Sequence, residues 1–169
     1  MEYLKQMLKI YINNNLSKED SFNQIIFEKS YFDSSIENNS FIKKTNNIKD
    51  FINNHNQYND FQTLLFKLID DRNLKDSDVY NKVHIDRRLF SKIRSDKNYH
   101  PSKETIILLA IALELSEDEL IELLDSASYS LPKNNNYDLI IRFCFINKIF
   151  KLSEINELLN EYKCKLFSY

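Results

Sequence analysis

The sequence contains no glycine and no tryptophan, and it has only two prolines and two cysteines among its 169 residues. Without glycine, the chain cannot form the glycine-rich loops that cradle phosphates in nucleotide-binding proteins, and collagen-like sequences are excluded as well. The lack of glycine also argues against tight turns with positive φ, a conformation that glycine adopts at the least cost. The cysteines, Cys144 and Cys164, have no second pair that would complete a zinc site.

Long apolar segments are missing too. The two longest runs, 106–113 and 139–146, are far shorter than the ~20 residues that cross a bilayer, and no cleavable signal is evident at the N-terminus. The net charge of −2 gives no overall attraction to nucleic acid or to an anionic membrane. Because 43% of the residues are hydrophobic, the chain can bury a core. We therefore expect a cytoplasmic protein without a membrane partner.

Apolar residues recur at helical spacing from residue 60 onward. A stripe at i, i+3, i+4, i+7 and i+8 predicts an amphipathic helix that begins at Phe61 and ends near Asn73. Four more helices are predicted, at about 76–83, 87–95, 102–115 and 116–125. The fourth helix of the five is apolar on every side over 106–115, which predicts that it lies at the buried centre of the domain.

Short polar residues are expected to cap the helices, because their side-chain oxygens accept hydrogen bonds from the free amides of the first turn. The predicted caps are Asp76 or Ser77, Asp86, Ser102 in a box-like relation to Thr105, Ser116 in a capping box with Glu119, and Ser153.

The remaining segments flank these five helices. Residues 126–136 contain Pro132 and three consecutive asparagines and are interpreted as a linker. Beyond the linker, two helices are predicted over 137–149 and 153–163, folding back on the first five. At the N-terminus, helical periodicity is present over 3–12 and 18–32, with a short helix at 48–52. The sequence thus predicts an all-α chain with a partly helical accessory region at 1–58, a five-helix unit at 59–128 and a C-terminal extension at 129–169.

Three short segments resemble a known family. They are IDRRLFSKI at 85–93, PSKET at 101–105 and AIALELS at 110–116. Together they resemble the Cro-like, phage-repressor-type helix-turn-helix family over about residues 60–125. The resemblance implies a five-helix unit whose third helix enters the major groove of double-stranded DNA, and a role in transcription regulation. Because such modules read two half-sites, it also favours a homodimer.

Two C-terminal segments, YDLII at 137–141 and EIN at 154–156, extend the similarity to the end of the chain. Here the sequence is similar to bacterial helix-turn-helix-like modules that are found attached to enzymatic or signalling domains. This similarity implies two further helices packed on the Cro-like unit, and it leaves the partner of the module open.

The distribution of charge supports a nucleic-acid surface. Residues 82–103 carry seven basic and two acidic side chains, whereas residues 104–128 carry seven acidic side chains and no basic one. The basic segment coincides with the third helix, where cations can neutralise phosphates. The candidate nucleic-acid-binding residues are Arg87, Arg88, Ser91, Lys92, Arg94, Lys97 and Tyr99. We expect Arg87 or Arg88 to contact guanine edges and Ser91 and Lys92 to contact phosphates.

Three positions depart from the family pattern. His84 replaces the usual glycine of the turn, Asp76 replaces a glutamine that contacts phosphate, and Tyr80 replaces a small residue of the second helix. Asp76 would repel phosphate, and Tyr80 would keep the second and third helices apart. These departures favour an alternative in which the fold binds a protein or RNA, as in an antitoxin, an adaptor or a phage-encoded inhibitor of a bacterial defence nuclease.

No catalytic constellation is recognisable. His84 and His100 have no second ligand at metal spacing. The carboxylates at 117–119 are consecutive and therefore diverge around a helix, so they cannot act on one substrate. We expect neither enzymatic activity nor a metal or cofactor.

Overall fold

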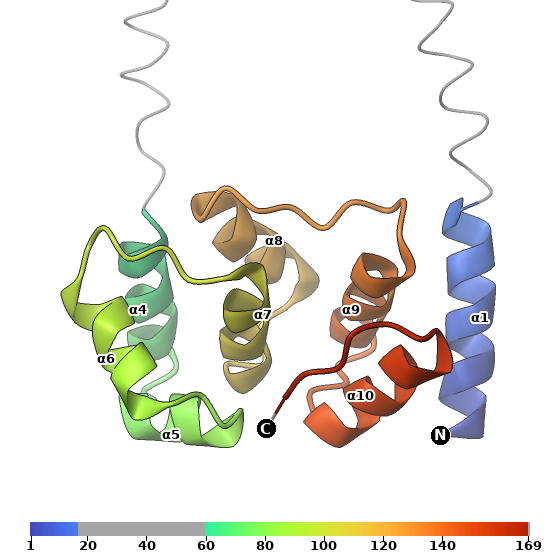
Figure 1. Ribbon diagram of the computed structural model, residues 1–169, viewed down its shortest axis with the longest axis horizontal. Coiled ribbons are helices and arrows are strands. Elements are labelled where there is room, and N and C mark those ends of the chain that lie inside the picture. The colour runs from blue at the N-terminus through green and yellow to red at the C-terminus, as the bar shows by residue number, and fades with distance from the viewer. Residues whose placement is uncertain (17–59, 169) are drawn as a thin grey trace, which may run out of the picture. The chain divides into compact units, whose positions relative to one another are not determined.

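The computed structural model describes residues 1–16 and 60–168, which are helical and contain no strand. Figure 1 shows the arrangement of the helices. Their bounds are α1 Glu2–Leu16, α4 Phe61–Asp71, α5 Asp76–Lys82, α6 Arg87–Ser95, α7 Lys103–Ala112, α8 Glu117–Ser126, α9 Asn136–Ile146 and α10 Leu152–Glu161. The predicted all-α class is confirmed for these residues, and the helices predicted over 18–32 and 48–52 lie outside them.

None of the helices in the described part of the chain has both the length and the hydropathy that crossing a membrane would require.

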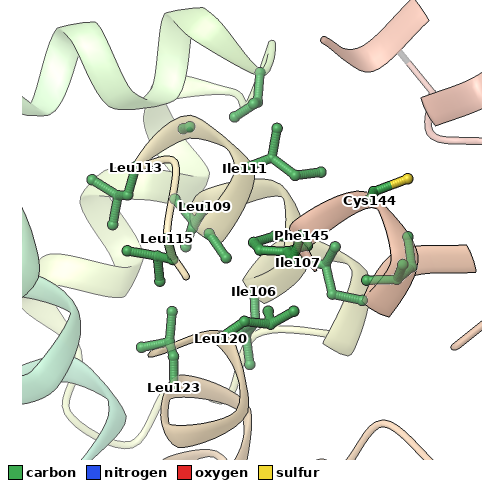
Figure 2. Packing of buried hydrophobic residues seen from close by; sticks show 14 of the residues in the cluster. Ile106, Ile107, Leu109, Ile111, Leu113, Leu115, Leu120, Leu123, Cys144 and Phe145 are labelled. Carbon is green, nitrogen blue, oxygen red and sulfur yellow. The ribbon is translucent and has the colours of Figure 1, made fainter. Parts of the chain in front are cut away.

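Helix α7 forms the centre of the core. Its residues Ile107, Leu109 and Ile111 have no exposed surface. Figure 2 shows side chains of α7 meeting those of α8 and α9, including Leu120 and Phe145, which belong to the same hydrophobic cluster. The prediction of a buried central helix is confirmed, because a helix that is apolar on every side has no face to offer to water.

Helix α9 adds a fully buried thiol to this cluster. Cys144 has no exposed surface, and burial raises the pKa of its thiol to about 12. At neutral pH the side chain is therefore uncharged and packs as a small apolar group.

The N-terminal helix α1 packs against α9 (Figure 1). The ring centroids of Tyr11 in α1 and Phe143 in α9 lie 5.7 Å apart, and the Lys5 ammonium lies 3.0 Å from a carboxylate oxygen of Glu157 in α10. Met1–Leu16 therefore belongs to one compact unit with the chain from Asn59 onward. This differs from the division expected from the sequence, which groups α1 with an accessory region at 1–58.

The helix starts confirm three of the predicted caps. The side chains of Asp86, Ser102 and Ser116 accept hydrogen bonds from backbone amides of the helices that follow them. Ser116 and Glu119 also form the reciprocal hydrogen bonds of a capping box. The sequence predicted these caps correctly because each is a short polar residue directly before an apolar stripe.

Two predicted caps are wrong. The N-cap of α5 is Lys75, so Asp76 and Ser77 lie inside the helix. The N-cap of α10 is Lys151, and Ser153 is likewise helical. Neither lysine caps the first turn through its side chain in the way that serine or aspartate would. At the start of α5, the Asp78 carboxylate instead accepts a hydrogen bond from the Lys75 backbone amide at 3.4 Å.

The helix ends overturn an expectation based on composition. Six residues in the described chain have a left-handed backbone, with φ from 51° to 59°: Asn73, His84, Glu114, Ser128, Lys148 and Lys163. Each directly follows the C-cap of a helix. The expectation that a chain without glycine avoids positive φ is therefore wrong. The last two of these turns also explain why α9 and α10 end before the predicted residues 149 and 163.

The same hydrogen-bond pattern recurs at all six ends. At the end of α5, the His84 amide donates to the Asn81 carbonyl at 3.3 Å and the Ile85 amide donates to the Tyr80 carbonyl at 2.9 Å. This is the Schellman motif, in which the residue after the left-handed position contacts the last turn of the helix. The residues in that position are Leu74, Ile85, Leu115, Tyr129, Ile149 and Cys164. Ile85, Leu115 and Ile149 are buried, and their packing offsets the cost of ~1–2 kcal/mol of a left-handed residue other than glycine.

A buried ion pair joins the five-helix segment to the C-terminal helices. The Lys103 ammonium at the start of α7 lies 2.6 Å from Asp138 Oδ1 in α9. Asp138 is 3% exposed, and its second oxygen, Oδ2, accepts a hydrogen bond from the side-chain amide of Asn135 at 2.8 Å. Both carboxylate oxygens are thus satisfied, as a buried charge requires.

Arg72 joins α4 to two other elements, the end of α7 and α8. At the end of α4, its guanidinium donates to the Leu113 carbonyl at 3.1 Å and to Glu119 Oε1 of α8 at 2.7 Å. Burial opposes the ionisation of Glu119, but the hydrogen bonds from Arg72 and Ser116 outweigh it and lower the pKa of the carboxyl.

We expect Ser128→Gly to raise the free energy of unfolding by about 0.5–1 kcal/mol. Glycine avoids the steric cost of the left-handed conformation but loses more chain entropy on folding. Urea unfolding followed by circular dichroism measures the change. As a control, Glu122→Gly places glycine at an exposed position inside α8 and should lower stability by about 1 kcal/mol. Equal losses in both variants would contradict the role assigned to the left-handed turns.

We expect Asp138→Ala to lower the free energy of unfolding by about 3 kcal/mol, because it leaves the partly buried Lys103 charge without its partner. Glu154→Ala, which removes the exposed pair of Glu154 with Lys151, should cost less than about 0.5 kcal/mol. Chemical denaturation of the two variants in parallel tests the difference. A loss for Asp138→Ala as small as that of the control would show that the buried pair does not join the two segments.

Candidate nucleic-acid interface

The apolar and polar residues of helix α6 lie on different faces of the helix. Phe90 and Ile93 are buried against the core. With 3.6 residues per turn, Arg87, Arg88 and Ser91 fall on the opposite side of the helix, and all three are exposed. Lys92 and Ser95 extend this exposed face. Ser95 is not among the nucleic-acid-binding residues predicted from the sequence. The exposed face of α6 is therefore polar and basic along its whole length.

The seven basic residues of segment 82–103 divide into two groups. Lys82 pairs with Glu114 at 2.6 Å, Arg94 pairs with Asp76, and Lys103 pairs with the buried Asp138. The other four are exposed and form no ion pair with any residue in 1–16 or 60–168; they are Arg87, Arg88, Lys92 and Lys97. The local excess of positive charge at the surface thus comes from these four side chains.

His84, Asp76 and Tyr80, which differ from the pattern that the sequence resembles, each have a defined environment in the structure. His84 adopts φ 56°, so it takes the conformation for which glycine is usual. The Asp76 carboxylate pairs with Arg94, which neutralises the charge that would repel phosphate. The Tyr80 ring packs on Phe90 with centroids 5.5 Å apart, so the larger side chain fills the space between α5 and α6.

Arg94 and Tyr99 are held by contacts within the protein. The Arg94 guanidinium lies 3.9 Å from the centroid of the Phe66 ring and also pairs with Asp76. Tyr99 is half-buried against the core, and the Lys92 ammonium lies 4.4 Å from its ring centroid. One face of the Tyr99 ring is thus covered by a cation. Of the seven predicted site residues, these two are the least available to a nucleic acid.

Gln62 in α4 fixes the far end of α6. Its side-chain amide donates to the Ile93 carbonyl at 2.8 Å and also to the Arg94 carbonyl. These carbonyls lie in the last turn of α6, where no following helical residue satisfies them. No sequence pattern points to this residue, because only the tertiary fold brings position 62 beside positions 93 and 94.

The described residues contain no group of three or more histidine, cysteine, aspartate or glutamate side chains that could hold a metal ion. His100, which has no second metal ligand at a suitable spacing in the sequence, bonds through Nε2 to the Ala127 carbonyl at 2.7 Å, and its ring lies 5.1 Å from that of Tyr129. This histidine therefore holds the segment before α7 against the end of α8.

Comparison with protein-family models finds no match to this chain, and comparisons with curated proteins and with solved structures find no match either.

We expect Gln62→Ala to loosen α6 while the rest of the fold persists, because the carbonyls at the end of α6 lose their donor. Amide hydrogen exchange in α6 should become faster, whereas exchange in α8 should stay near that of the parent chain. Thr63→Ala changes the adjacent exposed position and serves as the control. A uniform increase of exchange over all helices would show that Gln62 contributes only to global stability.

Proposed function

We propose that this chain is a DNA-binding regulator that uses α5 and α6 as a helix-turn-helix. The observation that carries the proposal is the exposed face of α6, where Arg87, Arg88 and Lys92 form no ion pair with the described residues. Cations on such a face neutralise phosphates and release counterions, which supplies sequence-independent affinity for a duplex.

The dimensions of α6 suit the major groove. An α-helix with its side chains is about 10–12 Å across, and the major groove is about 12 Å wide. Arg87 and Arg88 occupy the first turn, from which a recognition helix contacts base edges. Ser91 and Lys92 lie one turn later, where they can reach the phosphates that border the groove.

A homodimer follows from the same proposal. One module of this size makes few base contacts, and two modules on adjacent half-sites, about 34 Å apart, give the affinity that a regulator needs.

A protein partner is the second candidate. Tyr3 and Ile10 of α1 are 72% and 62% exposed, and because they are seven residues apart they share one face of the helix. Exposed aromatic and aliphatic side chains on one helix face suit a protein interface more than a nucleic acid. An antitoxin, an adaptor or an inhibitor of a defence nuclease would use such a surface.

The test is the affinity for a generic duplex as a function of salt concentration, measured by fluorescence anisotropy. A DNA-binding chain should show a linear decrease of log affinity with log salt. We expect the double variant Arg88→Gln, Lys92→Gln to reduce the slope by at least about 0.9, which is the contribution of the one phosphate contact assigned to Lys92. Lys133→Gln, an exposed lysine of the connection between α8 and α9, should leave the slope unchanged.

Two outcomes would overturn the proposal. One is a parent chain without measurable duplex affinity at low salt, which favours the protein partner instead. The other is an equal slope for the double variant and for Lys133→Gln, which would mean that the exposed face of α6 does not contact the duplex.

A further inference from the structure

A hollow of about 590 Å³ opens between the turn that precedes α6 and the start of α10. Its walls come from three places in the sequence: the end of α5 and its turn, the end of α7, and the connection from α9 to α10. The lining residues are Lys82, His84, Glu114, Lys148, Phe150, Lys151, Leu152 and Ser153. The hollow thus joins the helix-turn-helix segment to the C-terminal helices.

The charge of the lining is positive. It contains three lysines, Lys82, Lys148 and Lys151, and one carboxylate, Glu114, which pairs with Lys82 at 2.6 Å. Lys148 forms no ion pair with any described residue, and the Lys151 side chain is 73% exposed, with Glu154 at 3.7 Å. By contrast, a hollow beside α1 is lined by two glutamates and two lysines and has no net charge.

One wall of the hollow lies close to the first turn of α6. His84 in this wall precedes Arg87, the first residue of α6, by three positions. Three residues of extended chain reach at most about 11 Å. Because a duplex carries one phosphate charge for about every 1.7 Å of its axis, a duplex bound at the first turn of α6 presents several further phosphates over a distance of this size.

We propose that Lys148 and Lys151 bind backbone phosphates of the duplex that α6 contacts. Both lysines lie in the connection between α9 and α10 and line the positively charged hollow. Through them, the C-terminal helices extend the nucleic-acid surface beyond the helix-turn-helix. This inference rests on the proposed DNA-binding function and adds a second contact region to it.

The chain offers a matched pair of lysines for the test. Lys148 and Lys163 are both exposed, both follow a helix C-cap, and both have φ 54°, but only Lys148 lines the hollow. Asparagine tolerates the left-handed conformation, so Lys148→Asn and Lys163→Asn each remove one charge at a backbone site of the same kind. A third variant, Lys148→Asn with Lys151→Gln, removes both cations.

The measurement is the salt dependence of binding to a generic duplex by the full chain. Lys148→Asn should reduce the slope by about 0.9 and the double variant by about 1.8. Lys163→Asn should bind as the parent chain does. Equal slopes for Lys148→Asn, Lys163→Asn and the parent would overturn the inference, while a reduced slope for Arg88→Gln, Lys92→Gln in the same series would show that the proposed function stands.

A small phosphorylated molecule could supply the same chemistry as a duplex phosphate. Titration with inorganic phosphate at constant ionic strength, followed through the amide resonances of Leu152 and Ser153, separates the two sources. Saturable shifts together with an unchanged duplex slope for Lys148→Asn would assign the hollow to a small anion and overturn the inference. A reduced slope without saturable shifts supports the assignment to the duplex.

Discussion

The direction of nearly every helix in the described chain depends on one kind of turn. A residue in the left-handed conformation follows the C-cap of the helix. The backbone amide of the next residue, which is often apolar, donates a hydrogen bond to a carbonyl in the last turn of the helix. At His84 and Ile85 this turn brings the chain from α5 into α6, and at Glu114 and Leu115 it brings the chain from α7 into α8. Because Ile85 and Leu115 are buried, the hydrophobic core holds these turns in a conformation that their residues disfavour when isolated.

Ion pairing determines which of the cations between positions 82 and 103 remain unpaired at the surface. Basic residues are concentrated between positions 82 and 103, yet Lys103 is used to join α7 to the buried Asp138, and Arg94 neutralises Asp76. Buried or partly buried charges require partners, whereas exposed charges do not. Within positions 82–103, the four cations without ion partners in the described residues are those of α6 and the loop after it.

Much of the fold was predictable from local patterns. The stripe of α4, the apolar body of α7 and the caps Asp86, Ser102 and Ser116 were predicted correctly, because amphipathic spacing and capping act within a few residues. The starts of α5 and α10 were predicted wrongly, because the N-cap residues Lys75 and Lys151 make no side-chain cap hydrogen bond. The packing of α1 on α9 joins positions more than a hundred residues apart, and no local pattern encodes such a contact.

The sequence by itself determined the helical class, the central position of α7 and the basic character of α6, because periodicity and charge are properties of neighbouring residues. Only the tertiary structure decided which of these cations form ion pairs, how Gln62 holds the end of α6, and that Lys148 lines a hollow near His84. These properties depend on distances between elements that are remote along the chain, and the packing of the whole core sets those distances.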